Sequence, residues 1–217
     1  MKKATLVFAF WVCATLMAFS QGARPGWTEY RINGGEVVLS LPNSMKLFHS
    51  KEKGFSSVKN ADGSYSVNSR EEVLFVPLTD QTDYDKEEDM NLNNMVVVMI
   101  DDDKDGLGKA IELMQKYPTA RSVVGWGLKI AVGLERHSND EVKMTAKKNV
   151  TLKKVGDKDA VFMGISLEDK TGKMADGDAY LIENRGKGII VAFLKEQGKT
   201  GFTKKDIDEV LSTIRFK

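Results

Sequence analysis

The sequence predicts an α+β fold, a single domain in which a mainly antiparallel β-sheet is flanked by helices. Three observations predict it: short segments in which apolar and polar residues alternate, tight turns between those segments, and two segments with helical periodicity. The composition is that of a globular protein, with 41% hydrophobic and 29% charged residues and a mean hydropathy of −0.31. It excludes the collagen, low-complexity and coiled-coil classes.

The N-terminal segment has the pattern of a secretory signal peptide. Lys2 and Lys3 precede an apolar run over residues 4–19, and the small residues Ala18 and Ser20 offer a cleavage site. The rival interpretation is a retained membrane anchor, but the apolar run is shorter than the roughly 20 residues that a spanning helix needs. We therefore expect a signal peptide over residues 1–20 and a single domain over residues 21–217. The protein would be exported, periplasmic or secreted, with no membrane span after cleavage.

The single cysteine, Cys13, lies within the predicted signal peptide. Its removal would leave no disulfide, no thiolate nucleophile and no cysteine metal ligand. The residues before it, Phe10, Trp11 and Val12, do not fit a bacterial lipid-attachment site. The formal charge of +1 for the whole chain does not point to a nucleic-acid partner.

The first predicted strands form a hairpin. Residues 30–32 lead into Asn33 and Gly34, after which Val37, Leu39 and Leu41 alternate with polar residues. An Asn-Gly pair between alternating runs is a strong hairpin signal. Two further strands are expected over residues 73–78 and 95–100, and the second is apolar on both faces, as a central strand would be.

The C-terminal half predicts an antiparallel meander. Val161, Met163, Ile165 and Leu167 alternate with their neighbours, and strands over residues 180–183 and 189–194 follow. Turns at 170–173 and 185–188 separate these strands. Connections this short join antiparallel neighbours.

Two segments have one apolar stripe at helical spacing, so each is expected to pack as a helix on the sheet. The first begins near Gly106 and ends before Pro118. The second begins at Thr203, where Asp206 three residues later suggests a capping box. The two stripes are Leu107, Ala110, Ile111 and Met114, and Ile207, Val210, Leu211 and Ile214.

Both ends of the chain resemble the PsbP-like superfamily, which includes DcrB-type bacterial envelope proteins and eukaryotic Mog-type Ran-binding proteins. The residues that carry the resemblance are Tyr30 with the run 37–45, and the apolar strand 189–194 followed by Phe202 and the run 207–216. The chain has Met45 where many members carry tryptophan. The resemblance implies an antiparallel sheet sandwiched by helices, in a family whose members mostly bind other macromolecules. It transfers no site residues.

The sequence contains no catalytic motif. His49 and His137 are the only histidines that could act as a general base beside a nucleophile. No G-x-S-x-G nucleophile elbow is present. Ser50 and Ser138 adjoin these histidines in sequence only, and two isolated histidines without cysteine make a poor zinc site. A hydrolase would therefore have to use carboxylates alone.

One segment has the residue spacing of a calcium-binding loop. Asp101, Asp103, Asp105 and Glu112 occupy positions 1, 3, 5 and 12 of the pattern, with Gly106 at position 6. The alternative is that the aspartates cap the following helix and complement its dipole. Both interpretations stay open, and no cofactor other than calcium is indicated.

Charge is distributed unevenly along the chain. Residues 80–105 are rich in acids, whereas residues 143–158 are rich in lysine. Solvated loops and strand edges explain this pattern, and a surface for a charged partner is the alternative. The sequence thus predicts an exported, non-enzymatic binding or accessory protein of the cell envelope that acts through a protein surface on an unidentified protein partner, and not on nucleic acid. The alternatives are a carboxylate-based hydrolase and a weak calcium-binding module.

Overall fold

The computed structural model describes the following residues: 24–48, 54–69, 73–78, 94–103, 106–117, 142–146, 150–169 and 174–217. The predicted signal peptide, both histidines and the turn at 170–173 lie outside these ranges. So does most of the acidic run between residues 80 and 105.

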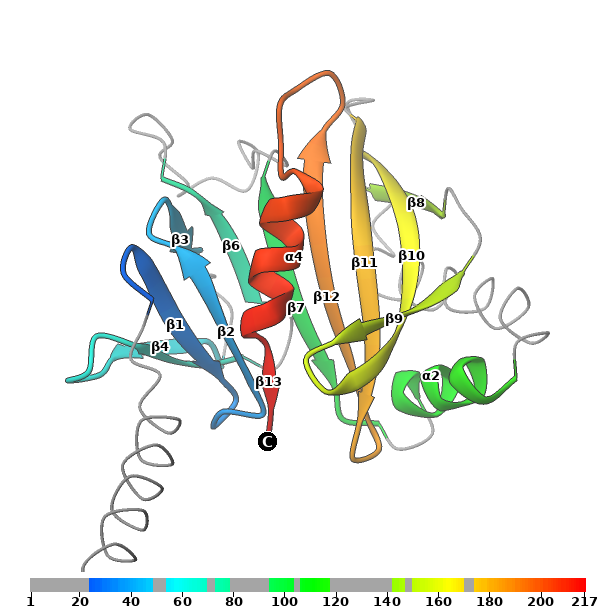
Figure 1. Cartoon of the computed structure of the whole chain (residues 1–217), viewed down its shortest axis with the longest axis horizontal. Coiled ribbons are helices and arrows are strands. Elements are labelled where there is room, and N and C mark those ends of the chain that lie inside the picture. The colour runs from blue at the N-terminus through cyan, green and yellow to red at the C-terminus, as the bar shows by residue number, and fades with distance from the viewer. Residues whose placement is uncertain are drawn as a thin grey trace, which may run out of the picture.

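Two β-sheets form the fold (Figure 1). The five-stranded sheet has the order β13-β2-β1-β5-β4, and the eight-stranded sheet has the order β3-β6-β7-β12-β11-β10-β8, with β9 paired to β10. Within the described residues β1 and β5 are the one parallel pair. The strands are β1 (Trp27–Ile32), β2 (Val37–Pro42), β3 (Met45–Leu47), β4 (Ser56–Lys59), β5 (Tyr65–Asn68), β6 (Val73–Pro77), β7 (Met95–Asp101), β8 (Val142–Ala146), β9 (Thr151–Val155), β10 (Lys158–Asp169), β11 (Met174–Asn184), β12 (Lys187–Glu196) and β13 (Arg215–Phe216).

The predicted hairpin is confirmed by the antiparallel pairing of β1 with β2, in which Ile32 lies opposite Val37. Asn33, Gly34 and Gly35 have φ values of 48°, 68° and 85°, which asparagine and glycine adopt with little strain. The side chain of Asn33 also accepts a hydrogen bond from the backbone N–H of Ser69, at 2.9 Å. The turn therefore closes the hairpin and ties it to β5.

The predicted meander is also confirmed, since β10, β11 and β12 pair in sequence with antiparallel register. Each face of this sheet packs against its own hydrophobic core, and side chains alternate between the two. On β12, Val191 and Phe193 point into one of them, which we call the first core, and Ile190 and Leu194 point into the other, the second core. Strand β7 lies between β6 and β12, as expected for a segment that is apolar on both faces.

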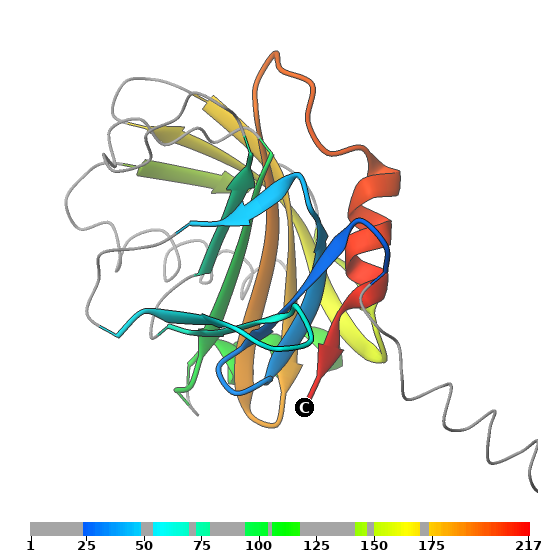
Figure 2. The same cartoon turned by 90° about the vertical axis from the view of Figure 1, so that its left-hand side faces the viewer.

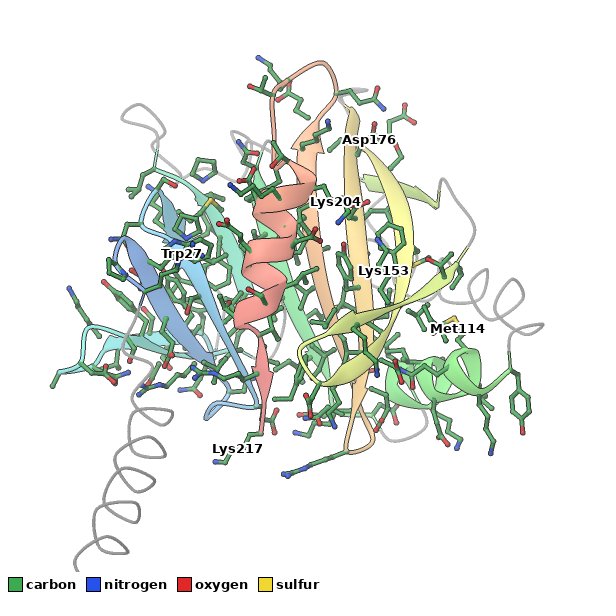
Figure 3. The ribbon with its side chains drawn as sticks, in the orientation of Figure 1. Trp27, Met114, Lys153, Asp176, Lys204 and Lys217 are labelled. Carbon is green, nitrogen blue, oxygen red and sulfur yellow. The ribbon has the colours of Figure 1, made fainter. Side chains whose placement is uncertain are left out.

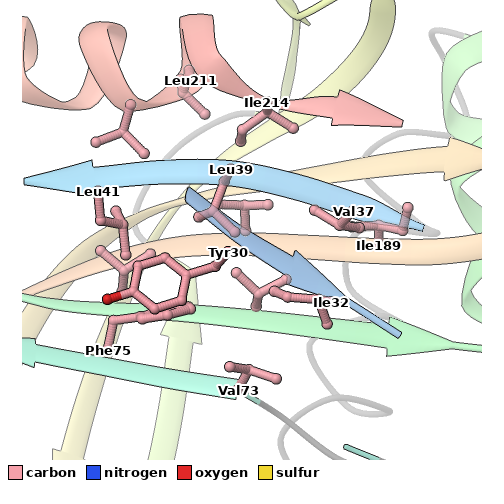
Figure 4. Packing of buried hydrophobic residues seen from close by; sticks show 14 of the residues in the cluster. Tyr30, Ile32, Val37, Leu39, Leu41, Val73, Phe75, Ile189, Leu211 and Ile214 are labelled. Carbon is pink, nitrogen blue, oxygen red and sulfur yellow. The ribbon is translucent and has the colours of Figure 1, made fainter. Parts of the chain in front are cut away.

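The expectation of a mainly antiparallel sheet flanked by helices is confirmed in part, and the fold is richer in sheet than expected because a second sheet covers one face of the eight-stranded sheet (Figure 2). The side chains of Tyr30, Leu39 and Leu41 pack there with Phe75 (Figure 4), and Phe193 belongs to the same core. The hairpin prediction identified these apolar residues without showing what they pack against. The fold is thus mostly antiparallel sheet with two described helices.

Helix α2 (Leu107–Lys116) covers the second face of the eight-stranded sheet and buries Leu107, Ile111 and Met114, as the stripe predicts. Helix α4 (Lys204–Thr213) runs between β2 and β12 (Figure 1), and its apolar stripe joins the first core. The hydroxyl of Thr213 accepts from the backbone N–H of Ser40 at 2.9 Å, which attaches the end of α4 to β2. No helix in the described part of the chain has the length and apolar character needed to cross a bilayer.

The capping box at the start of α4 is confirmed and leads to a prediction. The hydroxyl of Thr203 accepts from the N–H of Asp206, and the Asp206 carboxylate accepts from the N–H of Thr203 at 2.8 Å. Asp206→Ala is expected to lower the free energy of unfolding by about 1 kcal/mol at neutral pH. Chemical denaturation of the two proteins measures this difference.

The same variant has a predictable pH dependence. The Thr203 hydroxyl and backbone N–H both donate to the Asp206 carboxylate, which lowers its pKa below 3.8 in the folded protein. A depressed folded-state pKa contributes stability that is complete above the unfolded-state pKa and is lost as the pH falls through the folded-state pKa. The stability difference between wild type and Asp206→Ala should therefore narrow below pH 3.8. A difference that stays constant through that range would contradict the assigned cap.

Candidate binding cleft

The aspartates of the predicted calcium loop lie at the start of α2. Asp101 accepts two backbone hydrogen bonds, from the N–H of Leu107 at 2.8 Å and from the N–H of Asp103 at 3.1 Å. These bonds satisfy a donor of the first helical turn, which Gly106 at the N-cap cannot do because it has no side chain. Asp101 therefore serves as the helix cap.

Glu112, the expected twelfth calcium ligand, pairs with Lys109 on the exposed face of α2 at 2.7 Å. The ammonium group of Lys109 lowers the pKa of Glu112. Asp105 lies outside the described residues, and within them no group of three or more His, Cys, Asp or Glu side chains is placed to hold a metal ion. The calcium loop stays a prediction.

Asp101→Ala separates the two roles of this loop. Loss of the cap is expected to lower the free energy of unfolding by about 1 kcal/mol, with or without millimolar calcium. Thermal melting with calcium and with a chelator makes the comparison. A melting temperature that rises with calcium in wild type, and not in Asp101→Ala, would instead identify a cation site.

A cleft of about 450 Å³ lies where the meander extends past the start of α4. Residues of β10, β11 and β12 line it, and the cross-strand rows of these strands become more polar toward this end of the meander. From the inside outwards these rows are Phe162, Tyr180 and Val191; then Gly164, Asp178 and Phe193; then Ser166, Asp176 and Lys195. Gly164 has no side chain to fill the middle row, so the cleft forms beside it.

Four aromatic side chains, which we call the aromatic row, run through this region: Phe162, Tyr180, Phe193 and Phe202. Successive ring centroids are 5.3, 6.1 and 5.6 Å apart, and the last two pairs meet edge to face. This is the preferred geometry of aromatic pairs, worth about 0.5–1.5 kcal/mol each beyond the area that they bury. The row gives the cleft rigid apolar walls.

A lysine of the chain already lies on this row. The ammonium nitrogen of Lys153, from β9, is 3.4 Å from the ring centroid of Phe162 and 5.5 Å from that of Tyr180. Such a position over a ring face is a cation–π interaction. Figure 3 shows Lys153 on β9, Asp176 on β11 and Lys204 on α4.

The carboxylates near the cleft differ in their partners. Asp176 accepts from the Ser166 hydroxyl at 3.0 Å and from the Gln197 amide at 3.1 Å. Asp178 lies in the middle row, and its side chain makes no hydrogen bond or ion pair with another described residue. Burial raises the pKa of Tyr180, and the negative charge of Asp178 raises it further. The Tyr180 phenol therefore stays protonated beside the Asp178 side chain.

Several polar side chains have partners that bear on a hydrolytic role. Beside the cleft, the Ser166 hydroxyl donates a hydrogen bond to the Asp176 carboxylate at 3.0 Å. Elsewhere Asp62, Glu112 and Asp206 have a pKa below the ordinary value, because hydroxyl or ammonium groups donate to each carboxylate. A general acid would need the opposite shift.

A second concentration of charge lies on the five-stranded sheet. Arg31 bonds Glu29 at 2.8 Å and Asp62 at 2.7 Å, and Arg215 bonds Glu29 at 2.5 Å. Two hydrogen bonds from Ser64, together with Arg31, lower the pKa of Asp62 to about 2. The guanidinium groups are thus used internally, to connect β13 and the β4–β5 turn with β1.

The sequence interpretation did not identify the cleft residues Phe162, Asp178 and Phe202 as functional. One signal was present: Gly164 interrupts an otherwise alternating strand, and such a glycine often marks close backbone approach or open space. The spatial association of these residues depends on strand register. That register is set only by the complete sheet.

No protein-family model matches the chain, and no curated protein sequence matches it. It is similar to the solution structure of cyanobacterial PsbP (CyanoP) from Synechocystis sp. PCC 6803, with 12% identity, a TM-score of 0.54, and coverage of 91% of this chain and 96% of that one. A crystal structure from Bacteroides thetaiotaomicron aligns with 12% identity and a TM-score of 0.48, over 88% of this chain. The alignment spans 49% of that protein's length. The chain has a PsbP-like fold.

Proposed function

We propose that this chain is an exported, non-enzymatic accessory protein of the cell envelope that binds a protein partner through the cleft beside α4. Within the PsbP-like superfamily its relatives would be the DcrB-type envelope proteins and the Mog-type Ran-binding proteins. The observation that carries the proposal is a cleft with aromatic walls, a charged rim and the Asp178 carboxyl group among its lining residues. Enrichment in aromatic anchors with a polar rim is typical of protein interfaces.

The alternative of a carboxylate-based hydrolase has less support. Two acids acting together need one raised pKa, for protonation of a leaving group. Asp176 accepts hydrogen bonds from Ser166 and Gln197. Asp178 lies two residues further along β11. A binding role needs no carboxyl group with a raised pKa, only a surface that fits the partner.

Site-specific photo-crosslinking tests the cleft as the binding surface. Lys204 lines the cleft and Lys205 does not, although both side chains are 84% exposed and adjacent on α4. A photo-reactive residue at position 204 is expected to capture a partner in the native envelope fraction. The same residue at position 205 is the matched control and should not. Equal capture at both positions, or at neither, would contradict the proposal.

Export is tested independently of binding. Lys2, Lys3 and the apolar run over residues 4–19 support cleavage after Ser20. Mass spectrometry of protein recovered from outside the inner membrane should find a chain that begins at or near Gln21. Recovery of the uncleaved form with Met1, retained in the membrane, would overturn this part of the proposal.

A further inference from the structure

We infer that the cleft recognises a cationic side chain, the lysine or arginine of its protein partner, with Asp178 as the counter-ion and the aromatic row as the wall. This inference rests on the proposed function and adds the chemistry of the group that is bound. Three observations on the described residues support it: the partners of each charge around the cleft, the aromatic geometry, and the position of Lys153.

Asp178 differs from the other charged residues around the cleft in having no oppositely charged side chain next to it among the described residues. Lys204 forms an ion pair with Asp208 one helical turn away on α4. Lys195 lies directly opposite Asp176 across the β11–β12 pair, where opposite charges attract. Asp178 lies between Gly164 and Phe193 and has no basic residue opposite it on either strand. A positive ligand would complete this arrangement, whereas a negative one would be repelled.

The aromatic row suits a cation because ring faces carry negative electrostatic potential. Lys153 shows that this property is used in the molecule itself, since its ammonium nitrogen is 3.4 Å from the centroid of Phe162. Phe193 and Phe202, further along the row, line the cleft on the other side of Asp178. A lysine or arginine side chain could extend its apolar stem along these rings and place its charge at the carboxylate.

The inference is tested with small probes observed by amide-resolved NMR. The probes are the Nα-acetyl methylamides of lysine and arginine, with that of norleucine as the uncharged match for the lysine stem. The cationic probes are expected to shift the amides of β10–β12 at millimolar concentration, and Asp178→Asn should weaken their binding about tenfold, the equivalent of roughly one charge-assisted hydrogen bond. Asp159→Asn is the matched control, since it removes a charge from β10 that already pairs with Lys154 outside the cleft.

Each outcome has a defined meaning. Norleucine binding as tightly as lysine, or cationic probes insensitive to Asp178→Asn, would overturn the inference. Unchanged melting temperatures for Asp178→Asn and Asp159→Asn confirm that both variants fold. If the position-204 crosslink persists in Asp178→Asn at wild-type yield, the cleft binds its partner without this carboxylate, so the inference fails while the proposed function stands. If cationic probes bind as predicted but no partner is ever captured at position 204, the proposed function fails instead.

Discussion

Replacing Phe75 with alanine is expected to lower the free energy of unfolding by about 3–5 kcal/mol, the range for buried phenylalanines in well-packed cores. The side chain of Phe75 is 0% exposed and lies where the two sheets meet (Figure 4). The ring of Tyr30, from the five-stranded sheet, meets it edge to face with centroids 4.7 Å apart. Backbone atoms on both sides belong to sheets and cannot easily collapse into the space that the ring leaves. Chemical denaturation measures the loss as a lower transition midpoint.

Leu78→Ala is the control for this prediction. Leu78 directly follows β6 and is 57% exposed, so its truncation should change the stability by less than about 0.5 kcal/mol. If the loss at Phe75 is no larger than that at Leu78, the two sheets do not pack through this ring. The assignment of a shared core between them would then be wrong.

Gly108→Ala is expected to destabilise the protein although it improves helix propensity. Alanine in place of glycine gains at most about 1 kcal/mol in a helix. A Cβ at position 108, however, would lie 2.5 Å from the carbonyl oxygen of Gly186 in the β11–β12 turn. That contact is with backbone, which cannot rotate away, and such overpacking destabilises by about 1–3 kcal/mol or more. We expect a net loss of about 2 kcal/mol, measured by chemical denaturation.

Two further variants decide whether close packing is the cause. Gly188→Ala should destabilise similarly, since its Cβ would lie 2.6 Å from the Cβ of Leu107 and 2.7 Å from the N of Gly108. Lys109→Ala, on the exposed face of the same helix, should change stability by less than about 0.5 kcal/mol. A stabilised Gly108→Ala protein would mean that α2 does not approach the β11–β12 turn this closely.

The elements that were predicted are those whose signal is local. Helices α2 and α4 begin and end close to the predicted positions because their apolar spacing, the Thr203 cap and Pro118 act within a few residues. The β1–β2 hairpin followed from Asn33 and Gly34 for the same reason. In each case neighbouring residues alone decide the backbone conformation.

Other strands were missed because their residues form strands only when a partner is present. β4 and β5 are short and rich in serine, and β5 joins the sheet by pairing in parallel with β1, which precedes it by more than thirty residues. Strand β11 was predicted over residues 180–183 but begins at Met174. Asp176, Gly177 and Asp178 have low β-propensity, and they are held in the strand by pairing with β10 on one side and β12 on the other.

The candidate site depends on the same nonlocal pairing. The calcium-like spacing at Asp101 was visible in the sequence, yet the structure uses Asp101 to cap α2. The cleft was not visible, because Phe162, Asp178, Phe193 and Phe202 lie far apart along the chain and come together only through strand register.

Residue order alone therefore specified the helices, the hairpin, the meander and the pattern of an export signal, all of which follow from short-range periodicity and turn chemistry. Tertiary structure decided the packing of a second sheet over the first. It also decided that the Asp178 carboxyl group, beside the aromatic row, has no basic partner among the described residues. The reason is physical: a strand's side chains alternate in direction whatever lies beside it, but which side chains meet depends on the partner strand and its register.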